Sequence, residues 1–151
     1  MFFVVDITRL QKMIALTRDD RGRGKQRKKG PFFRMEARGS TLRLTGREVE
    51  ASFSATVYEE GVLFLRVTVF REQIAMIRGR GMLTIQVQAD GLHFGDTTLR
   101  LASAEMLLYT DPATAPPRHP QEVADEAEEA EQRAAQEAAD KARRDAKARR
   151  F

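Results

Sequence analysis

The chain of 151 residues has room for one compact domain with an appendage, and its hydrophobic fraction of 42% is normal for a globular protein. Its formal net charge of +4 and sequence pI of about 9.8 favour polyanionic partners, without distinguishing DNA from RNA or an anionic membrane. The absence of cysteine excludes a disulfide framework and a thiolate metal site. The apolar start Met1–Val5 reaches Asp6 at once, which is too short for a signal peptide or a membrane span. We therefore expect a soluble, cytoplasmic protein.

The first half of the chain shows one strand, one helix and then three strands. Residues 2–5 form a short apolar strand, and residues 7–17 have helical spacing, with Leu10, Met13 and Ile14 on one face. A polar stretch from Arg18 to Gly30 follows. The next three strands are expected at residues 32–38, 41–45 and 49–58, and the last of them alternates well between apolar and polar residues.

The same order of elements recurs in the second half. A strand at residues 62–69 leads into a short helix at residues 70–78 that buries Phe70, Ile74 and Ile77. Three more strands are expected, and a final apolar stretch extends the sheet, at residues 82–88, 92–94, 97–101 and 106–109. Each half is thus strand–helix–strand–strand–strand. This repeat predicts an α+β domain with pseudo-twofold symmetry, in which two helices pack side by side on antiparallel sheets.

The chain beyond residue 110 differs in composition from the domain at residues 1–110. Residues 111–120 are rich in proline, which predicts a flexible linker. Residues 121–151 contain no proline or glycine and consist mainly of alanine and charged residues, which predicts a helical tail. Its acidic residues come first and its basic residues last, an order that complements the helix dipole. Two tails could pair antiparallel along a narrow alanine stripe, and the simpler alternative is a solvated single helix.

Four stretches of the domain share their order and spacing with a known family. Residues 3–12 (FVVDITRLQK) form an opening strand and helix, and residues 41–50 (TLRLTGREVE) form a strand pair of the type L-x-L-x-[AT]-x-D-x-E. Residues 67–79 lead from a strand into the second helix, and residues 83–101 form closing hairpins around an Asp90-Gly91 turn. Taken in this order, the stretches resemble one domain of the bacterial sliding clamp, the β subunit of DNA polymerase III, and its N-terminal domain most closely.

The chain departs from the clamp family in three respects. Arg47 stands where the family usually has Asp, and Thr68-Val69 replace a common proline before the second helix. One domain is present where a bacterial clamp chain has three. The resemblance implies that the two helices line the inner face of a ring and pass over DNA phosphates. It also implies assembly through strand edges into rings of six domains, so we expect a homo-oligomer, of which a six-copy ring is one form.

Basic residues mark the surfaces on which duplex DNA would lie. On the two helices and the turn after the second one, the candidates are Arg9, Lys12, Arg71, Arg78 and Arg80. The polar stretch after the first helix adds seven more, namely Arg18, Arg21, Arg23, Lys25, Arg27, Lys28 and Lys29. Such a run neutralises several phosphates, giving affinity that is independent of DNA sequence and sensitive to salt. A solvated basic helix surface and a solubilising loop are the structural alternatives.

The sequence offers little for catalysis. The histidines His93 and His119 fit no metal-ligand spacing, and no cysteine nucleophile exists, so we predict no catalytic site, no metal site and no cofactor. Gly24-Lys25 is followed by Gln26, which excludes a phosphate-binding P-loop. We expect a non-enzymatic protein of DNA replication or repair, partnered by duplex DNA and by a polymerase or similar proteins, with no membrane partner. The alternative is a protein-interaction adaptor that keeps the clamp fold without closing a ring.

Overall fold

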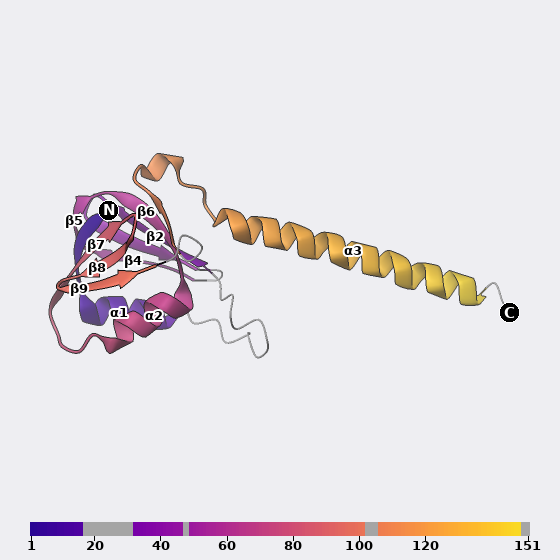
Figure 1. The fold of residues 1–151 in the computed structure, drawn as a ribbon, viewed down its shortest axis with the longest axis horizontal. Coiled ribbons are helices and arrows are strands. Elements are labelled where there is room, and N and C mark those ends of the chain that lie inside the picture. The colour runs from indigo at the N-terminus through magenta and orange to yellow at the C-terminus, as the bar shows by residue number, and fades with distance from the viewer. Residues whose placement is uncertain (17–31, 47–48, 102–105, 149–151) are drawn as a thin grey trace. The chain divides into compact units, whose positions relative to one another are not determined.

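The computed structural model of the protein describes residues 1–16, 32–46, 49–101 and 106–148 (Figure 1). The chain divides into two units, Met1–His119 and Pro120–Phe151, and the second contains one long helix, α3 (Pro120–Ala148). Within its described residues, the first unit contains β1 (Phe2–Asp6), α1 (Ile7–Leu16), β2 (Phe32–Arg38), β3 (Thr41–Thr45), β4 (Glu50–Ser54), β5 (Thr56–Glu59), β6 (Gly61–Arg66), α2 (Val67–Met76), β7 (Met82–Gln88), β8 (Gly91–Phe94), β9 (Thr97–Arg100), β10 (Met106–Tyr109) and the short 3-10 helix η2 (Pro112–Thr114).

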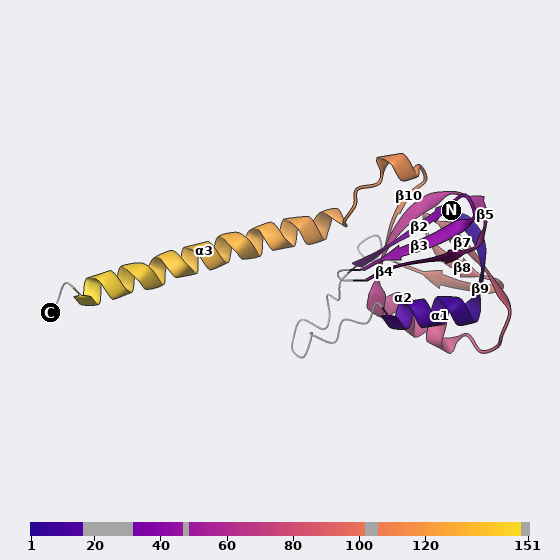
Figure 2. The ribbon, with the colours of Figure 1, turned by 180° about the vertical axis from the view of Figure 1, so that it is seen from behind.

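The strands form two antiparallel sheets of five strands each (Figures 1 and 2). Sheet A has the order β5-β1-β7-β8-β9, and sheet B has the order β10-β6-β2-β3-β4. The first strand of each half therefore pairs with the later strands of the other half, β1 with β7 and β6 with β2. The predicted α+β architecture with a repeated element order is confirmed. Each half also ends in one further strand, β5 or β10, which pairs with the first strand of the same half.

One apolar core joins the two sheets and the two helices. Sheet A contributes Phe3 and Ile85, and sheet B contributes Met35 and Leu42, all fully buried. The ring of Phe70 in α2 lies 5.4 Å from that of Phe33 in β2 and 6.1 Å from that of Phe94 in β8, so α2 contacts both sheets. Burial of apolar side chains at this junction is the main force that holds the sheets together.

The helices α1 and α2 lie side by side, as the sequence predicts (Figures 1 and 2). Each buries one apolar stripe, with Leu10 and Ile14 on α1 and Phe70 and Ile74 on α2. The side-chain amide of Gln11 in α1 donates to the carbonyls of Ile74 and Ile77, both at 3.3 Å. These bonds reach carbonyls at the end of α2 and just beyond it, and so tie the end of α2 to α1.

The prediction of a single strand over residues 49–58 is wrong. The structure has β4 in sheet B and β5 in sheet A, separated at the buried residue Ala55. The amide of Ala55 donates to the carbonyl of Ser40 at 3.0 Å, which continues the register of β3 and β4 up to the point where the chain changes sheets. Apolar residues continue to alternate across this point because both sheets face the same core. Periodicity therefore gives no sign of the break.

The second incorrect boundary is the start of α2. Residues 67–69 were predicted to end a strand, but the helix begins at Val67 and ends at Met76, so Ile77 and Arg78 lie beyond it. Val67, Phe70 and Ile74 are buried at helical spacing. The β-branched residues Val67, Thr68 and Val69 favour a strand by propensity, but packing of this buried face overrides that preference. The other strands agree with their predicted bounds to within one residue.

Gly91 provides a test of the close pairing between β8 and β9. Its φ is +153°, and a Cβ atom at this position would lie 2.1 Å from the carbonyl oxygen of Leu99. We expect Gly91→Ala to lower the free energy of unfolding by about 3 kcal/mol or more, because a backbone clash adds to conformational strain of about 1–3 kcal/mol. Urea unfolding measures this change.

Gly39→Ala is the matched control for this test. Gly39 also has a positive φ, +60°, but a Cβ atom there would meet nothing within 4 Å. Its replacement should cost only the conformational penalty, about 1–2 kcal/mol. Equal losses of stability in the two variants would show that the approach of Leu99 to Gly91 does not constrain the sheet.

Candidate nucleic-acid interface

The exposed side of the helix pair carries two of the predicted DNA contacts on α1. Leu10 and Ile14 face the core, so Arg9 and Lys12, three residues apart, turn toward solvent, and both are exposed. The helix begins after Asp6, whose carboxylate accepts a hydrogen bond from the amide of Arg9 at 2.9 Å. This is an N-terminal cap, which satisfies one of the free amides of the first turn.

Three further predicted contacts belong to α2 and the turn that follows it. Arg71 is exposed on α2, at the flank of the stripe formed by the buried Phe70 and Ile74. Arg78 and Arg80 lie in the turn between α2 and β7, and both are exposed. The carbonyl of Gly81 accepts a hydrogen bond from the amide of Ile7 at 3.0 Å, which ties this turn to the start of α1. The structure therefore brings all five helix-associated basic residues onto one layer of the domain.

The charges of this helix layer are not compensated within the part of the chain that the structure describes. None of Arg9, Lys12, Arg71, Arg78 and Arg80 makes an ion pair there. On α1 and α2, the acidic residue is Glu72, which is exposed on α2. Five positive charges against one negative charge leave a surface with a net attraction for polyanions.

The remaining seven predicted contacts, Arg18, Arg21, Arg23, Lys25, Arg27, Lys28 and Lys29, lie outside the described residues. They belong to the connection from α1 to β2. A second group of basic residues therefore follows α1 in the sequence.

The outer face of sheet B carries a second, smaller apolar cluster that the sequence analysis missed. Phe32, Val62 and Phe64 form it, on the opposite side of the sheet from the main core. Their neighbours Phe33, Leu63 and Leu65 face the main core, so β2 and β6 are apolar on both faces. The unbroken apolar run at residues 62–65 was the available signal, because a strand covered on both faces loses its alternation.

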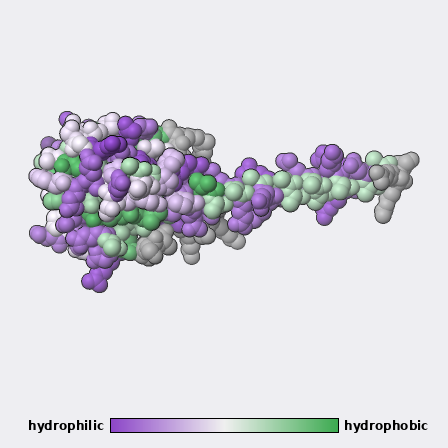
Figure 3. Space-filling view, turned by 90° about the horizontal axis from the view of Figure 1, so that it is seen from above, coloured by the Kyte–Doolittle hydropathy of each residue, from purple (hydrophilic) through white to green (hydrophobic). Residues whose placement is uncertain are grey.

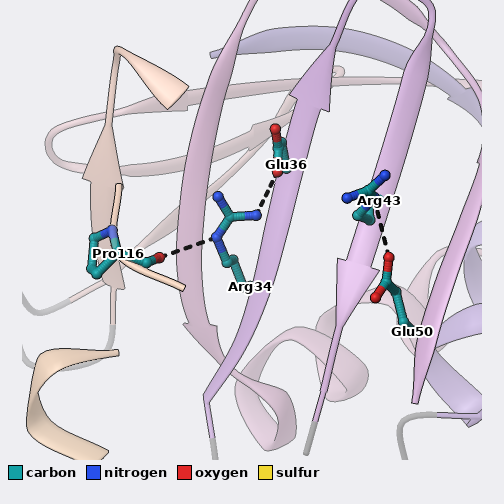
Figure 4. A network of polar contacts seen from close by, with 5 residues as sticks. All are labelled: Arg34, Glu36, Arg43, Glu50 and Pro116. Carbon is teal, nitrogen blue, oxygen red and sulfur yellow. Dashed lines mark hydrogen bonds and ion pairs between the residues drawn. The ribbon is translucent and has the colours of Figure 1, made fainter. Parts of the chain in front are cut away.

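Residues 110–119, here named the strap, pack over this second cluster. The ring of His119 stacks on Phe32 with the centroids 3.7 Å apart and meets Phe64 edge-on at 5.6 Å. Arg34 donates from Nε to the carbonyl of Pro116 at 3.2 Å (Figure 4). Most of the strap belongs to residues 111–120, which the sequence predicts as a flexible linker, and Pro116 and His119 make specific contacts with sheet B.

Two ion pairs on sheet B differ in their exposure (Figure 4). Arg34 and Glu36 form an ion pair in which both side chains are only 15% exposed. On the neighbouring strands, Arg43 and Glu50 lie 3.3 Å apart, with side chains 54% and 59% exposed. The first pair therefore interacts with little competition from water, whereas the second is a surface pair.

Both histidines make contacts with neighbouring side chains in the described residues. Nδ1 of His93 lies 3.0 Å from the hydroxyl of Thr98, and His119 stacks on Phe32. Across the described ranges no group of three or more histidine, aspartate or glutamate side chains could hold a metal ion. No helix in these ranges has the length and apolar character needed to cross a membrane.

Solved structures of bacterial sliding clamps share the fold of this chain. The DNA polymerase sliding clamp of Caulobacter crescentus matches with a TM-score of 0.58 at 12% identity, over 79% of this chain and 33% of that one. The Bartonella birtlesii clamp, DNA polymerase III subunit beta bound to griselimycin, matches with a TM-score of 0.58 at 14% identity, over 80% of this chain and 32% of that one. The Helicobacter pylori beta clamp bound to a DNA ligase peptide matches with a TM-score of 0.57 at 14% identity, over 79% of this chain and 34% of that one. No family model and no curated protein matches the sequence.

These matches define the fold as that of a single sliding-clamp domain. The chain spans about a third of the length of the clamps that it matches. The predicted resemblance to the β subunit of DNA polymerase III is thereby confirmed for the fold. At identities of 12–14% the likeness extends to the fold alone.

The half-buried Arg34–Glu36 pair should contribute more to stability than the exposed Arg43–Glu50 pair. We expect Arg34→Ala to lower the free energy of unfolding by about 1–3 kcal/mol, because it leaves Glu36 without its partner and releases the carbonyl of Pro116. Arg43→Ala, the matched control, should cost less than about 1 kcal/mol. Chemical unfolding measures both values. A loss from Arg43→Ala equal to that from Arg34→Ala would contradict this ranking.

Proposed function

We propose that this chain is a non-enzymatic, sliding-clamp-like protein that binds duplex DNA without sequence specificity through α1, α2 and the turn after α2. The observation that carries the proposal is the layer of five exposed basic residues without ion-pair partners in the described chain. Arg9, Lys12 and Arg71 are exposed on the helices, and Arg78 and Arg80 are exposed in the turn after α2. The clamps with the same fold are named as DNA polymerase subunits, which agrees with a DNA partner.

The chemistry of this layer suits phosphates better than bases. Arg and Lys side chains on a helix surface reach phosphate oxygens, which are the same along any duplex. Recognition of bases would instead require an element that enters a groove and presents specific donors and acceptors. A phosphate-binding surface holds DNA by counterion release, so its affinity falls steeply with salt and differs little between sequences. Binding that is equal at every position would let a protein stay on a duplex while moving along the DNA.

The seven basic residues between Arg18 and Lys29 form the second part of the proposed surface. The segment leaves α1, whose Arg9 and Lys12 already belong to the helix layer. No aromatic residue lies between Arg18 and Lys29, so stacking on single-stranded bases is not supported. A duplex bound on the helices is therefore the favoured ligand of this segment as well.

The free strand edges support a proposal for assembly. In the described chain β4 and β9 are edge strands of sheets B and A, and the other two edges are β10 and β5. An edge strand leaves a row of backbone donors and acceptors that another chain can pair with. We propose that copies associate through these edges into a homo-oligomer, which closes into a ring if the rotation between copies allows it. A monomeric adaptor that keeps the clamp fold is the second candidate function.

A double variant of the helix layer tests the DNA proposal. We expect Arg71→Ala with Arg78→Ala to weaken binding equally for duplexes of different sequence, because phosphate contacts are lost. The slope of log affinity against log salt should become shallower by about 1.8, or about 0.9 for each contact. Fluorescence anisotropy of labelled duplexes over a salt series measures both quantities.

The matched control for this test removes two arginines elsewhere. Arg38→Ala with Arg43→Ala changes the net charge by the same amount, on exposed positions of sheet B. This variant should keep nearly the original slope. Replacement of Arg27, Lys28 and Lys29 by Ala tests the basic segment, with an expected change of about 2.7. If the sheet variant lost as much slope as the helix variant, net charge and not the helix layer would govern binding.

Light scattering of the full chain and of a chain that ends at His119 tests the assembly. Residues 1–119 contain all the described edge strands. We therefore expect the shortened chain to remain a homo-oligomer, at concentrations where the full chain is one. A full chain that stays monomeric at high concentration, with and without DNA, would favour the adaptor. A shortened chain that becomes monomeric would show instead that the helix α3 drives association.

A further inference from the structure

The two halves of the domain place equivalent residues on the outer faces of the two sheets. β1 leads into α1 as β6 leads into α2, so Val4 and Phe64 are equivalent, each three residues before its helix begins. Val4 pairs with β5, and Phe64 pairs with β10. In these strands, Tyr58 and Tyr109 each stand two residues beyond the partners of Val4 and Phe64. The two tyrosines are therefore equivalent as well.

Each of these tyrosines contacts an aromatic ring of the neighbouring strand. Tyr58 stacks on Phe2 with the centroids 4.8 Å apart, and Tyr109 meets Phe64 edge-on at 6.0 Å. On sheet B the strap covers this aromatic pair, and Phe64 is only 1% exposed. On sheet A, Tyr58 is 62% exposed. Among the described residues, equivalent aromatic pairs thus differ in their cover.

An apolar row crosses the outer face of sheet A. The alternation of β1 places Phe2 and Val4 on this face, between Tyr58 of β5 and Met82 of β7. Met82 is 65% exposed. These four residues are here named the apolar row. The other side chains around it are the uncharged Thr56, Thr84 and Gln86, with the acidic Asp6 and Glu59 at its two ends. The row is therefore surrounded by uncharged side chains along its middle.

The apolar row contains two of the most exposed hydrophobic side chains of the described chain. The large hydrophobic residues with strong exposure there are Tyr58, Met76, Met82 and Val123. Met76 lies at the end of α2, and Val123 lies on α3, whose other side chains are hydrophilic or only weakly hydrophobic (Figure 3). Single exposed hydrophobic residues are common on protein surfaces, whereas a contiguous group of them marks a binding surface.

The size of the row suits an extended segment better than a second copy of the domain. Strands lie about 4.8 Å apart and rise about 3.4 Å per residue, so a row over three strands and residues 2–6 covers about 10 Å by 14 Å. A stable interface between two proteins buries about 800 Å² on each partner. The row alone is several times smaller. An extended peptide of about five residues spans it.

The strap shows which kind of segment covers the equivalent site on sheet B. It contains three prolines, at positions 112, 116 and 117. The carbonyl of Pro116 accepts a hydrogen bond from Arg34 at 3.2 Å, and the ring of His119 stacks on Phe32. Proline supplies a carbonyl but no amide hydrogen, so a surface that holds a proline-rich segment must supply hydrogen-bond donors.

Sheet A offers the same combination of donors and apolar surface. Tyr58, Thr84 and Gln86 carry side-chain donors in or beside the row. Met82 is the equivalent of Phe32, because each pairs with the last residue of the strand before a helix. The outer face of sheet A therefore has the features that hold the strap on sheet B.

We propose that the apolar row binds an extended, proline-rich segment of another protein. Such a segment is extended before it binds, so little conformational entropy is lost, and its prolines pack on aromatic rings. The row lies on the face of sheet A that turns away from the core, into which α1 and α2 pack. It is therefore separate from the basic helix layer, and the proposal does not depend on DNA binding.

A titration of the full chain with a peptide of ten prolines tests the proposal. Nuclear magnetic resonance of the isotope-labelled chain should show saturable shifts of the amides of Phe2, Val4 and Tyr58, with half-saturation at about 1 mM or below. A glycine–serine peptide of the same length should cause no such shifts. An absence of shifts with the proline peptide, or shifts confined to the strap around Ala115 and His119, would overturn the proposal.

Tyr58→Ala tests the role of the aromatic ring. We expect it to weaken binding of the proline peptide about fivefold or more, because truncation of a central aromatic contact costs over about 1 kcal/mol, equal to that factor. Met76→Ala, the matched control, removes an equally exposed hydrophobic side chain from α2 and should leave the affinity within about twofold. Equal losses in the two variants would contradict a site on sheet A.

Two further measurements on Tyr58→Ala separate this proposal from the others. Its affinity for duplex DNA should equal that of the natural chain, because the basic helix layer is unchanged. Its mass in solution, measured by light scattering, should also be unchanged. A variant that loses both peptide binding and association between copies would show that the row is an interface between copies of this chain, and the proposal would be wrong.

Discussion

The exchange of strands between the two halves of the domain determines the positions of the other elements. β1 pairs with β7, and β6 pairs with β2, so each sheet needs strands from both halves. The helices follow from this exchange, because α1 connects β1 in sheet A to β2 in sheet B, and α2 connects β6 in sheet B to β7 in sheet A. Two connections that cross between the same two sheets come to lie beside each other. The layer of basic residues is thus positioned by the pairing of strands on the other side of the core.

The two sheets differ in what covers their outer faces. On sheet B the strap covers Phe32 and Phe64, and the aromatic ring of His119 closes the cluster. On sheet A the exposed aromatic contact is the stack of Phe2 on Tyr58, with the centroids 4.8 Å apart. Within the described part of the domain, the strap therefore covers the outer face of sheet B, while Tyr58 on sheet A stays exposed. This difference distinguishes two faces that the repeated element order alone would make equivalent.

Sequence reasoning succeeded where one physical pattern dominates. The stripe of Leu10 and Ile14 identified α1, and the residues opposite that stripe, Arg9 and Lys12, are exposed as predicted. The order of strands and helices was sufficient to identify the clamp fold, although identity to the solved clamps is only 12–14%. Core volume and pattern are retained over many substitutions, so the order of elements persists after the residues have changed.

The errors arose where tertiary contacts replace the local pattern. The change of sheets at Ala55 keeps the same alternation, and the start of α2 at Val67 opposes β-branched propensity. Residues 111–120 are predicted as a linker because their prolines interrupt strands and helices, and composition gave no sign that the strap packs through His119 and the carbonyl of Pro116. Composition describes the conformations that a segment can adopt, whereas the contacts depend on which surfaces lie nearby.

The pairing of β1 with β7 also constrains the order of events during synthesis. β1 ends at Asp6 and β7 extends to Gln88, so the first strand has no partner from the other half until most of the domain has left the ribosome. Contacts so distant in sequence slow folding, because the entropy of closing a long loop is lost before the two strands can stabilise each other. During that time the apolar residues of β1, Phe3 and Val5 among them, have β5 as their available partner in sheet A. In a nascent chain of this protein, the first strand therefore lacks its neighbour in sheet A until β7 emerges.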